Sequence, residues 1–168
     1  MELRVRDVLA YLCGLNGMAT FSATLSARVM RRDGCVEDLG VVGIHEVTDA
    51  FVAQLVDTLK SSEATFSTYK YHDSGTGSTA EDQTDTTLDT PCGDARTTGT
   101  QIEGATANIY KSVATHTYGG TYAIIEHGLF NDATVGILMD RTVLGTAVNV
   151  ESGDKIEWSY SLACTAGG

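Results

Sequence analysis

Glycine and hydroxyl residues are concentrated between residues 73 and 79, where the sequence reads Asp-Ser-Gly-Thr-Gly-Ser-Thr. A glycine-rich turn of this kind binds a phosphate group when a lysine follows the glycines and a helix begins there. Neither condition is met, because no lysine follows the glycines and the next residues show no helical periodicity. We interpret the segment as a loop without a nucleotide site.

Three aspartates follow in the same polar stretch, Asp82, Asp85 and Asp89. Carboxylates and loop carbonyls are the ligands that a calcium ion prefers. The spacing of these aspartates matches no calcium-binding loop, and no glutamate stands at the offset of a bidentate ligand. Solvated loop carboxylates are therefore favoured over a cation site.

The four histidines are the next candidates for chemistry: His45, His72, His116 and His127. His72 precedes Asp73, and His127 follows Glu126, but neighbouring residues of a strand point to opposite faces, so neither is a good acid–base pair. The sequence contains no Gly-x-Ser-x-Gly nucleophile motif. Catalytic triads are assembled in space, so this absence excludes nothing, but we predict no catalytic residue and no enzyme.

The four cysteines, Cys13, Cys35, Cys92 and Cys164, lie far apart. No Cys-x-x-Cys motif and no Cys/His pair has the spacing of metal ligands, so neither a metal site nor a cofactor is predicted. The even number of cysteines permits two disulfides.

The distribution of charge is uneven. The net charge is −11, which argues against binding of a nucleic-acid backbone. Residues 1–32 contain five arginines and two acidic residues, a net of +3, so the remainder carries −14. A basic segment on an acidic body suggests a protein interface, and simple solvation of these arginines is the alternative that stays open. The candidate interface residues are Arg4, Arg6, Arg28, Arg31 and Arg32.

The first 18 residues form an N-terminal arm or a first element in this interpretation. A secretory signal is not favoured, because Asp7 interrupts the region and the apolar run that follows, residues 8–13, is too short. No stretch approaches the roughly 18 to 20 apolar residues that span a bilayer, so no membrane partner is predicted.

Hydrophobic periodicity predicts the elements that carry these residues. Residues 19–31 alternate apolar and polar side chains and predict a long strand with one buried face, followed by a turn at Asp33-Gly34. Residues 48–60 predict the one short helix, with Thr48 as N-cap. The apolar stripe of this helix is expected to cover an edge of the fold rather than to bind a separate groove. It consists of Val52, Leu55, Val56 and Leu59.

The rest of the chain predicts more strands. Residues 64–72 are β-prone, and residues 74–104 form a long Gly/Thr/Asp-rich loop with short edge strands near 86–88 and 96–102. Four further strands are expected at 107–116, 121–127, 135–142 and 154–162. In the last of these, Ile156, Trp158, Tyr160 and Leu162 should face inward. The prediction is a mainly β protein, a single-domain β-sandwich over 19–168 with jelly-roll or Ig-like Greek-key connections.

Three segments, in this order, carry a resemblance to known proteins: residues 70–81 (KYHDSGTGSTAE), 96–101 (RTTGTQ) and 125–131 (IEHGLFN), the last continuing through 138–142 to 148–154. They resemble a loose group of tailed-phage virion proteins described as capsid decoration (cement) proteins, head fibres or tail-fibre-like proteins. The resemblance covers about residues 64–162. The matching positions are Glu126, Gly128, Leu129, Phe130, Leu138, Arg141, Val148, Val150, Gly153, Asp154, Ile156, Tyr160 and Leu162, and Leu144 stands where the pattern usually has an aromatic residue.

The resemblance implies a non-enzymatic structural protein of a bacteriophage virion, assembled in the host cytoplasm, where thiols stay reduced. It implies a capsid decoration protein that binds the major capsid protein and associates with itself. The long polar loop suggests that a neighbouring subunit covers residues 74–104, and we expect a homotrimer. A head- or tail-fibre protein is the nearest alternative, although no internal repeat is present. A carbohydrate-binding β-sandwich module is the third, and the inward register of Trp158 argues against it.

Overall fold

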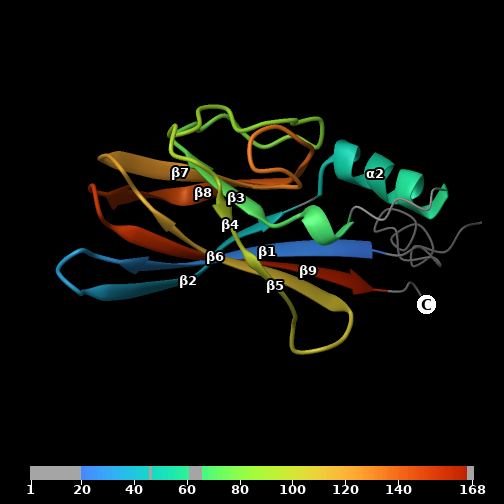
Figure 1. Cartoon of the computed structure of the whole chain (residues 1–168), viewed down its shortest axis with the longest axis horizontal. Helices are drawn as coiled ribbons and strands as arrows, with labels where there is room; N and C mark the ends of the chain where they lie inside the picture. Colours follow the sequence, from blue (N-terminus) through green and yellow to red (C-terminus); the bar gives the residue numbers. More distant parts are fainter. Residues whose placement is uncertain (1–19, 46, 61–65, 166–168) are drawn as a thin grey trace, which may run out of the picture.

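The computed structural model describes residues 20–45, 47–60 and 66–165, which form a single-domain β-sandwich of two antiparallel sheets (Figure 1). The first sheet has the strand order β2-β1-β9-β6-β5 and the second has the order β4-β3-β7-β8. The strands of the first sheet are β1 (Thr20–Met30), β2 (Val36–His45), β5 (Thr100–Glu103), β6 (Ile109–Thr117) and β9 (Lys155–Thr165). Those of the second are β3 (Tyr71–Gly75), β4 (Thr97–Thr98), β7 (Tyr122–Phe130) and β8 (Leu138–Val150). The predicted mainly β sandwich is confirmed. The predicted arm, residues 1–18, lies outside the described residues.

The central strands of the first sheet are the ones whose alternation was clearest in the sequence. In β1, the side chains of Ala23, Leu25, Ala27 and Val29 are buried and face the second sheet. In β9, the inward residues Ile156, Trp158, Tyr160 and Leu162 are buried, as predicted. β1 and β9 pair along their whole length, with Ala27 opposite Trp158. The two ends of the described chain therefore form the middle of one sheet.

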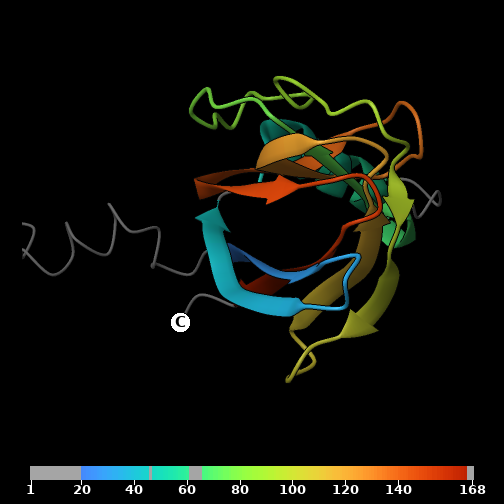
Figure 2. The same cartoon turned by 90° about the vertical axis from the view of Figure 1, so that its left-hand side faces the viewer.

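The two sides of the sandwich are closed in different ways. On one side the chain passes directly from β4 in the second sheet to β5 in the first, through Gly99. On the other side β2 curves toward β8, and both are edge strands of their sheets (Figure 2). A groove of about 550 Å³ opens between these strands, lined by Leu39 and Val42 of β2 and residues 144–149 of β8. The sequence did not predict β2, because Gly40, Gly43 and two register shifts against β1 break its alternation.

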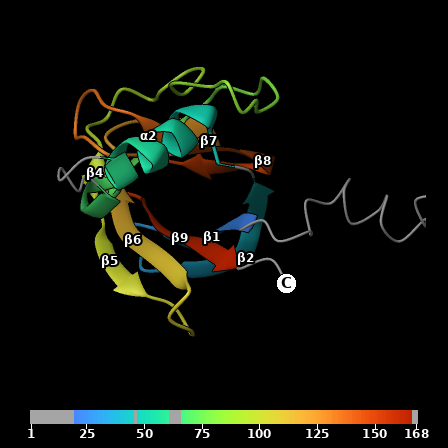
Figure 3. The same cartoon turned by 90° about the vertical axis from the view of Figure 1, so that its right-hand side faces the viewer.

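The helix α2 (Asp49–Lys60) lies across one end of the sandwich beside β8 (Figure 3). Thr48 is its N-cap, because its hydroxyl accepts a hydrogen bond from the backbone N–H of Phe51 at 3.2 Å. The predicted stripe is wrong in its orientation. Phe51 is the helix residue that is buried in the core, whereas Val52, Val56 and Leu59 are exposed by 40, 50 and 80%. No helix in the described part of the chain is long and apolar enough to cross a bilayer.

The region after α2 departs from the predicted boundaries. Residues 66–68 form a 3₁₀ turn, and the strand β3 begins only at Tyr71. It then continues through Asp73, Ser74 and Gly75, which were expected to end it, because these residues pair with Glu126, His127 and Gly128 of β7. Residues 86–88 form no strand, while the edge strands expected near 96–102 are present as β4 and β5.

Candidate functional site

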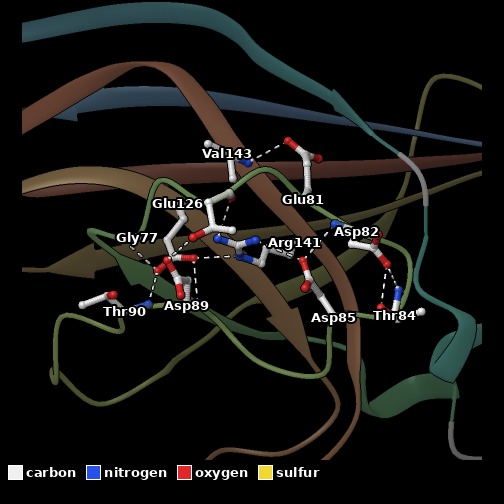
Figure 4. A network of polar contacts seen from close by, with 11 residues as sticks. Gly77, Glu81, Asp82, Thr84, Asp85, Asp89, Thr90, Glu126, Arg141 and Val143 are labelled. Atoms are coloured by element: carbon white, nitrogen blue, oxygen red, sulfur yellow. Dashed lines mark hydrogen bonds and ion pairs between the residues drawn. The ribbon is translucent and has the colours of Figure 1, made fainter.

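Glu126 of β7 is the centre of a polar network beneath the loop that joins β3 to β4 (Figure 4). Its side chain has no exposed surface, yet one carboxylate oxygen accepts hydrogen bonds from the backbone N–H groups of Gly77 and Thr90 at 3.0 and 2.7 Å. The other oxygen accepts one from the N–H of Asp89 at 3.0 Å. A Cβ at position 77 would lie 2.6 Å from this carboxylate, so the glycine allows the backbone to approach it.

Arg141 of β8 supplies the positive charge of this network. Its Nε donates to Glu126 at 2.8 Å, and one terminal nitrogen donates to Asp85 at 3.0 Å. The second terminal nitrogen donates to the carbonyl of Thr79 at 3.1 Å. The guanidinium thereby uses its fixed fork of donors to join the sheet to the loop. The loop between β3 and β4 is thereby held by contacts within the same chain, and its cover by a neighbouring subunit stays a prediction.

The three loop aspartates have separate partners. Asp85 accepts from Arg141, Asp82 from the N–H and hydroxyl of Thr84, and Asp89 from the hydroxyl of Thr79. Among the described residues, no metal-ligating cluster includes any of them. The arrangement is that of loop carboxylates used in turns and ion pairs.

A chain of hydrogen bonds between buried side chains crosses from one sheet to the other. His72 of β3 lies 2.9 Å from His127 of β7 through its Nδ1, and 2.8 Å from the hydroxyl of Ser112 of β6 through its Nε2. A hydroxyl next to an imidazole is what a nucleophile and its base require. All three side chains, however, have no exposed surface, so a substrate cannot reach them. Burial, with repulsion by His116, lowers the pKa of His72 to about 3, which keeps this imidazole neutral.

The prediction that each of these histidines and its acidic neighbour point to opposite faces of their strand is confirmed. His72 points into the core while Asp73 pairs with Arg96 at 3.2 Å, and Glu126 points to the loop while His127 packs on the ring of Trp158. The structure describes no side chain of His45. The histidines therefore connect the sheets to each other rather than to an acid on their own strand.

Asp140 of β8 is a second buried ionisable group. Its Oδ1 accepts a hydrogen bond from the hydroxyl of Thr142 at 3.0 Å, and its Oδ2 has no hydrogen-bond partner. Burial, and to a lesser degree repulsion by Glu81, raises the pKa of Asp140 to about 7. Burial therefore favours the protonated form of this carboxyl.

A cysteine, an aspartate and a histidine meet at the end of the sandwich. The possible ligand atoms of Cys92, Asp94 and His116 all lie within 4.8 Å of one another. His116 is 1% exposed, whereas the other two side chains are partly exposed. Sequence spacing did not reveal the cluster, because β4 and β5 lie between Asp94 and His116 in the chain. The sequence does contain one signal of the cluster, which is the short spacing between Cys92 and Asp94 on either side of Gly93.

Three of the five candidate interface arginines are described, and each pairs with acids of its own chain. Arg28 contacts Glu157 at 2.8 Å, and Arg32 contacts Glu151 at 2.9 Å. Arg31 lies 3.1 Å from Asp154, which is a position of the phage-protein pattern. Arg4 and Arg6 lie outside the described residues. The structure does not gather the five arginines into one site, and their role as an interface stays a prediction.

Two exposed apolar surfaces are present instead. On the edge strand β2, Val36, Val41 and Ile44 are exposed by 57, 60 and 73%. The second surface, the outer stripe of α2, consists of Val52, Val56 and Leu59. Exposed apolar residues that cluster on one element often mark a protein interface.

The three described cysteines, Cys35, Cys92 and Cys164, are free thiols. Comparison of the chain with protein-family models, with curated proteins and with solved structures finds no match.

Proposed function

We propose that this protein is a non-enzymatic structural protein of a tailed-phage virion, and that it acts as a capsid decoration protein. In this function it binds the major capsid protein on the outer surface of the particle and associates with copies of itself. The observation that carries the proposal is the resemblance of residues 64–162 to phage virion proteins, together with the positions that the resembling residues occupy.

Those positions are structural. Twelve of the thirteen matching residues are buried, and the other one, Gly153, lies in a turn. Arg141 and Glu126 form the network that holds the loop, and Asp154 accepts hydrogen bonds from Arg31 and from the backbone of Arg32. A pattern of this kind describes a stable β body and contains no reactive group. It supports a structural role, in which the protein keeps a stable fold and presents surfaces for binding.

The surfaces are of the kind that assembly requires. β2 is an edge strand of 10 residues, and an exposed edge offers unpaired backbone groups to another chain. The other edge strand of this side, β8, uses part of its backbone in hydrogen bonds with Thr48 and Glu81. β2 and the outer stripe of α2 also expose apolar side chains. These features support self-association, and the homotrimer predicted from the sequence is part of the proposal.

The enzyme alternative has little support from the geometry. Ser112, His72 and His127 have no exposed surface, and Asp140 is enclosed as well. Trp158, the single tryptophan, is buried too, so it offers no platform on which a sugar ring can stack. The buried polar groups are better explained as contacts that fix the two sheets relative to each other.

Copy number tests the proposal. Particles of the phage that encodes this chain are purified, and the ratio of this protein to the major capsid protein is measured by quantitative mass spectrometry. A decoration protein is expected at hundreds of copies per particle. Tens of copies or fewer would indicate a fibre or spike protein, and absence from the particle would refute a virion function altogether.

A further inference from the structure

We propose that Cys92, Asp94 and His116 form a binding site for a divalent transition-metal ion of the zinc class, with water as the fourth ligand. This inference is independent of the proposed function. It does not follow from sequence spacing, because the fold brings together a loop and a strand that are separate in the chain.

One ring nitrogen of His116 is available to bind a metal ion. His116 is 1% exposed, and its Nε2 has no hydrogen-bond partner although it is buried. The nearest carboxylate oxygen, Oδ2 of Asp94, is 3.8 Å away, which is beyond hydrogen-bond distance. The other ring nitrogen, Nδ1, lies 3.0 Å from the hydroxyl of Thr97. With the proton on Nδ1, as in other metal-binding histidines, Nε2 directs a lone pair toward Asp94.

The other two ligands are held by backbone contacts. The N–H of Cys92 donates to the carbonyl of Ser74 at 2.9 Å, which ties the cysteine to β3. Gly93 has a φ of +88°, a conformation that L side chains rarely adopt, and this turn brings Cys92 and Asp94 close together. Asp94 in turn accepts a hydrogen bond from the N–H of Gly119 at 3.1 Å.

The distances fit a tetrahedral ion after a small contraction. Zinc bonds to sulfur, nitrogen and oxygen place N and O about 3.3 Å apart and S and O about 3.5 Å apart. The corresponding distances are 3.8 Å from His116 Nε2 to Asp94 Oδ2 and 4.0 Å from Cys92 Sγ to the same oxygen. Closing these two gaps needs movements of about half an ångström. The ligand atoms of Cys92 and His116 lie within 4.8 Å of each other, so reaching the S···N separation of about 3.5 Å needs a movement of up to about 1.3 Å. Rotation of the two partly exposed side chains provides these movements.

The ligand types select the ion. Thiolate and imidazole favour zinc and its neighbours over calcium and magnesium, which prefer oxygen ligands. Binding replaces the thiol proton of Cys92, which passes to solvent. Since Asp94 and Cys92 are partly exposed, the ion and its water are reached from outside. The bound ion would fasten the loop at residues 92–94 to β6.

Cobalt(II) is the probe, since a thiolate bound to cobalt gives a charge-transfer absorption. The tag-free full chain is reduced, treated with a chelator and titrated with cobalt. We expect the charge-transfer band to saturate at one ion per chain, to disappear when zinc is added, and the melting temperature to rise with zinc. Cys164→Ser, which removes an exposed cysteine of β9, is the matched control and should titrate like the wild type.

The variants separate this site from chance binding. Cys92→Ser and Cys92→Ala should lose the band, Asp94→Ala should weaken binding, and Thr97→Val should lower affinity about 10- to 100-fold through His116. Each variant is first shown to melt as the metal-free wild type does. The proposal is overturned if the wild type gives no band or if the band survives in both Cys92 variants. It is also overturned if Asp94→Ala and Thr97→Val bind as the wild type does, because a lone thiol would then be the ligand.

Discussion

Glu126 takes the place that a bound anion takes in a glycine-rich binding loop. The segment at residues 73–79 was compared with a phosphate loop on its sequence and lacked the lysine and the helix. The N–H of Gly77 in this segment does contact an anion, the carboxylate of Glu126 on β7, which also accepts hydrogen bonds from the N–H groups of Asp89 and Thr90 further along the same loop. The positive charge is supplied by Arg141, also from outside the segment. The glycines are thus explained by an internal contact.

This network predicts an unequal effect of removing its two charges. Glu126→Leu leaves the Nε of the buried Arg141 and three backbone N–H groups without their acceptor, although the guanidinium keeps Asp85 and the Thr79 carbonyl, and should cost about 3 to 5 kcal/mol of unfolding free energy. Arg141→Met leaves the carboxylate with its three N–H donors and should cost less. Urea unfolding measures both. Proteolysis within the loop between β3 and β4 should accelerate in Glu126→Leu, and a loop that stays as resistant as in the wild type would contradict the network.

The buried carboxyl of Asp140 predicts that the free energy of unfolding depends on pH. Its folded pKa of about 7 lies above the unfolded value of 3.8, so its contribution to stability is fully present below 3.8 and is lost as pH rises through 7. Asp140→Asn removes this dependence. The unfolding free energy of the variant minus that of the wild type should therefore rise by about 1.4 kcal/mol per pH unit between those values.

His72 acts in the opposite sense, because its folded pKa of about 3 lies below the unfolded value of 6.5. Its contribution is present above pH 6.5 and is lost as pH falls toward 3. Since both proteins contain His72, its effect cancels in the comparison of Asp140→Asn with the wild type. Urea unfolding across pH 4 to 8 makes the measurement, and a difference that does not change with pH would show that Asp140 is not protonated by burial.

At the level of elements, the sequence predicted best the strands that have one buried face. The strict alternation of β1 and β9 follows directly from their position in the first sheet, where one face packs against the second sheet and the other points outward. β2 was missed because an edge strand with glycines and bulges does not alternate. The sequence misplaces the end of β3 because Asp73 and Ser74 are residues typical of turns, although the pairing with β7 and the contact of Asp73 with Arg96 keep them in the sheet.

The candidate clusters were harder to predict than the strands. His72, Ser112 and His127 come from three strands of two sheets, and Cys92 meets His116 across two intervening strands. Such contacts depend on topology, which local periodicity does not contain. The helix shows the same limit. Its outward and inward stripes both have apolar residues, and only the packing of Phe51 into the core decides between them.

The outer stripe of α2 gives a prediction for association. Val56→Lys with Leu59→Lys changes two exposed side chains, so the stability of the subunit should change by no more than about 0.5 kcal/mol per site. If copies meet at this stripe, sedimentation velocity should show a shift from oligomer to monomer at micromolar concentration. Val135→Lys is the matched control, because Val135 is 76% exposed but lies in the loop between β7 and β8 rather than on α2. An oligomer that persists in the double variant would place the contact elsewhere, and a monomeric wild type would contradict self-association.

At the level of the whole molecule, charge gives a prediction for capsid binding. Of the five candidate arginines, Arg28, Arg31 and Arg32 are paired within the chain, so the prediction concerns Arg4 and Arg6, which lie outside the described residues. Exposed ion pairs contribute only about 0 to 1 kcal/mol each, but many copies on one lattice act together. Arg4→Ala/Arg6→Ala protein should bind undecorated capsids more weakly than wild type at low salt, and the difference should shrink as salt screens the charges. Equal binding at low salt would show that these arginines are ordinary surface charges.

The central claim is that this β-sandwich decorates the outside of a phage capsid, and a density map of the intact particle tests it most directly. We expect density that fits the two sheets on the outer capsid surface, repeated over the lattice, with the contacts made by β2, by the outer stripe of α2 or by the N-terminal segment. Density for this fold at the tail or at a single vertex would identify a fibre or spike instead. A particle that contains no such density would contradict the claim.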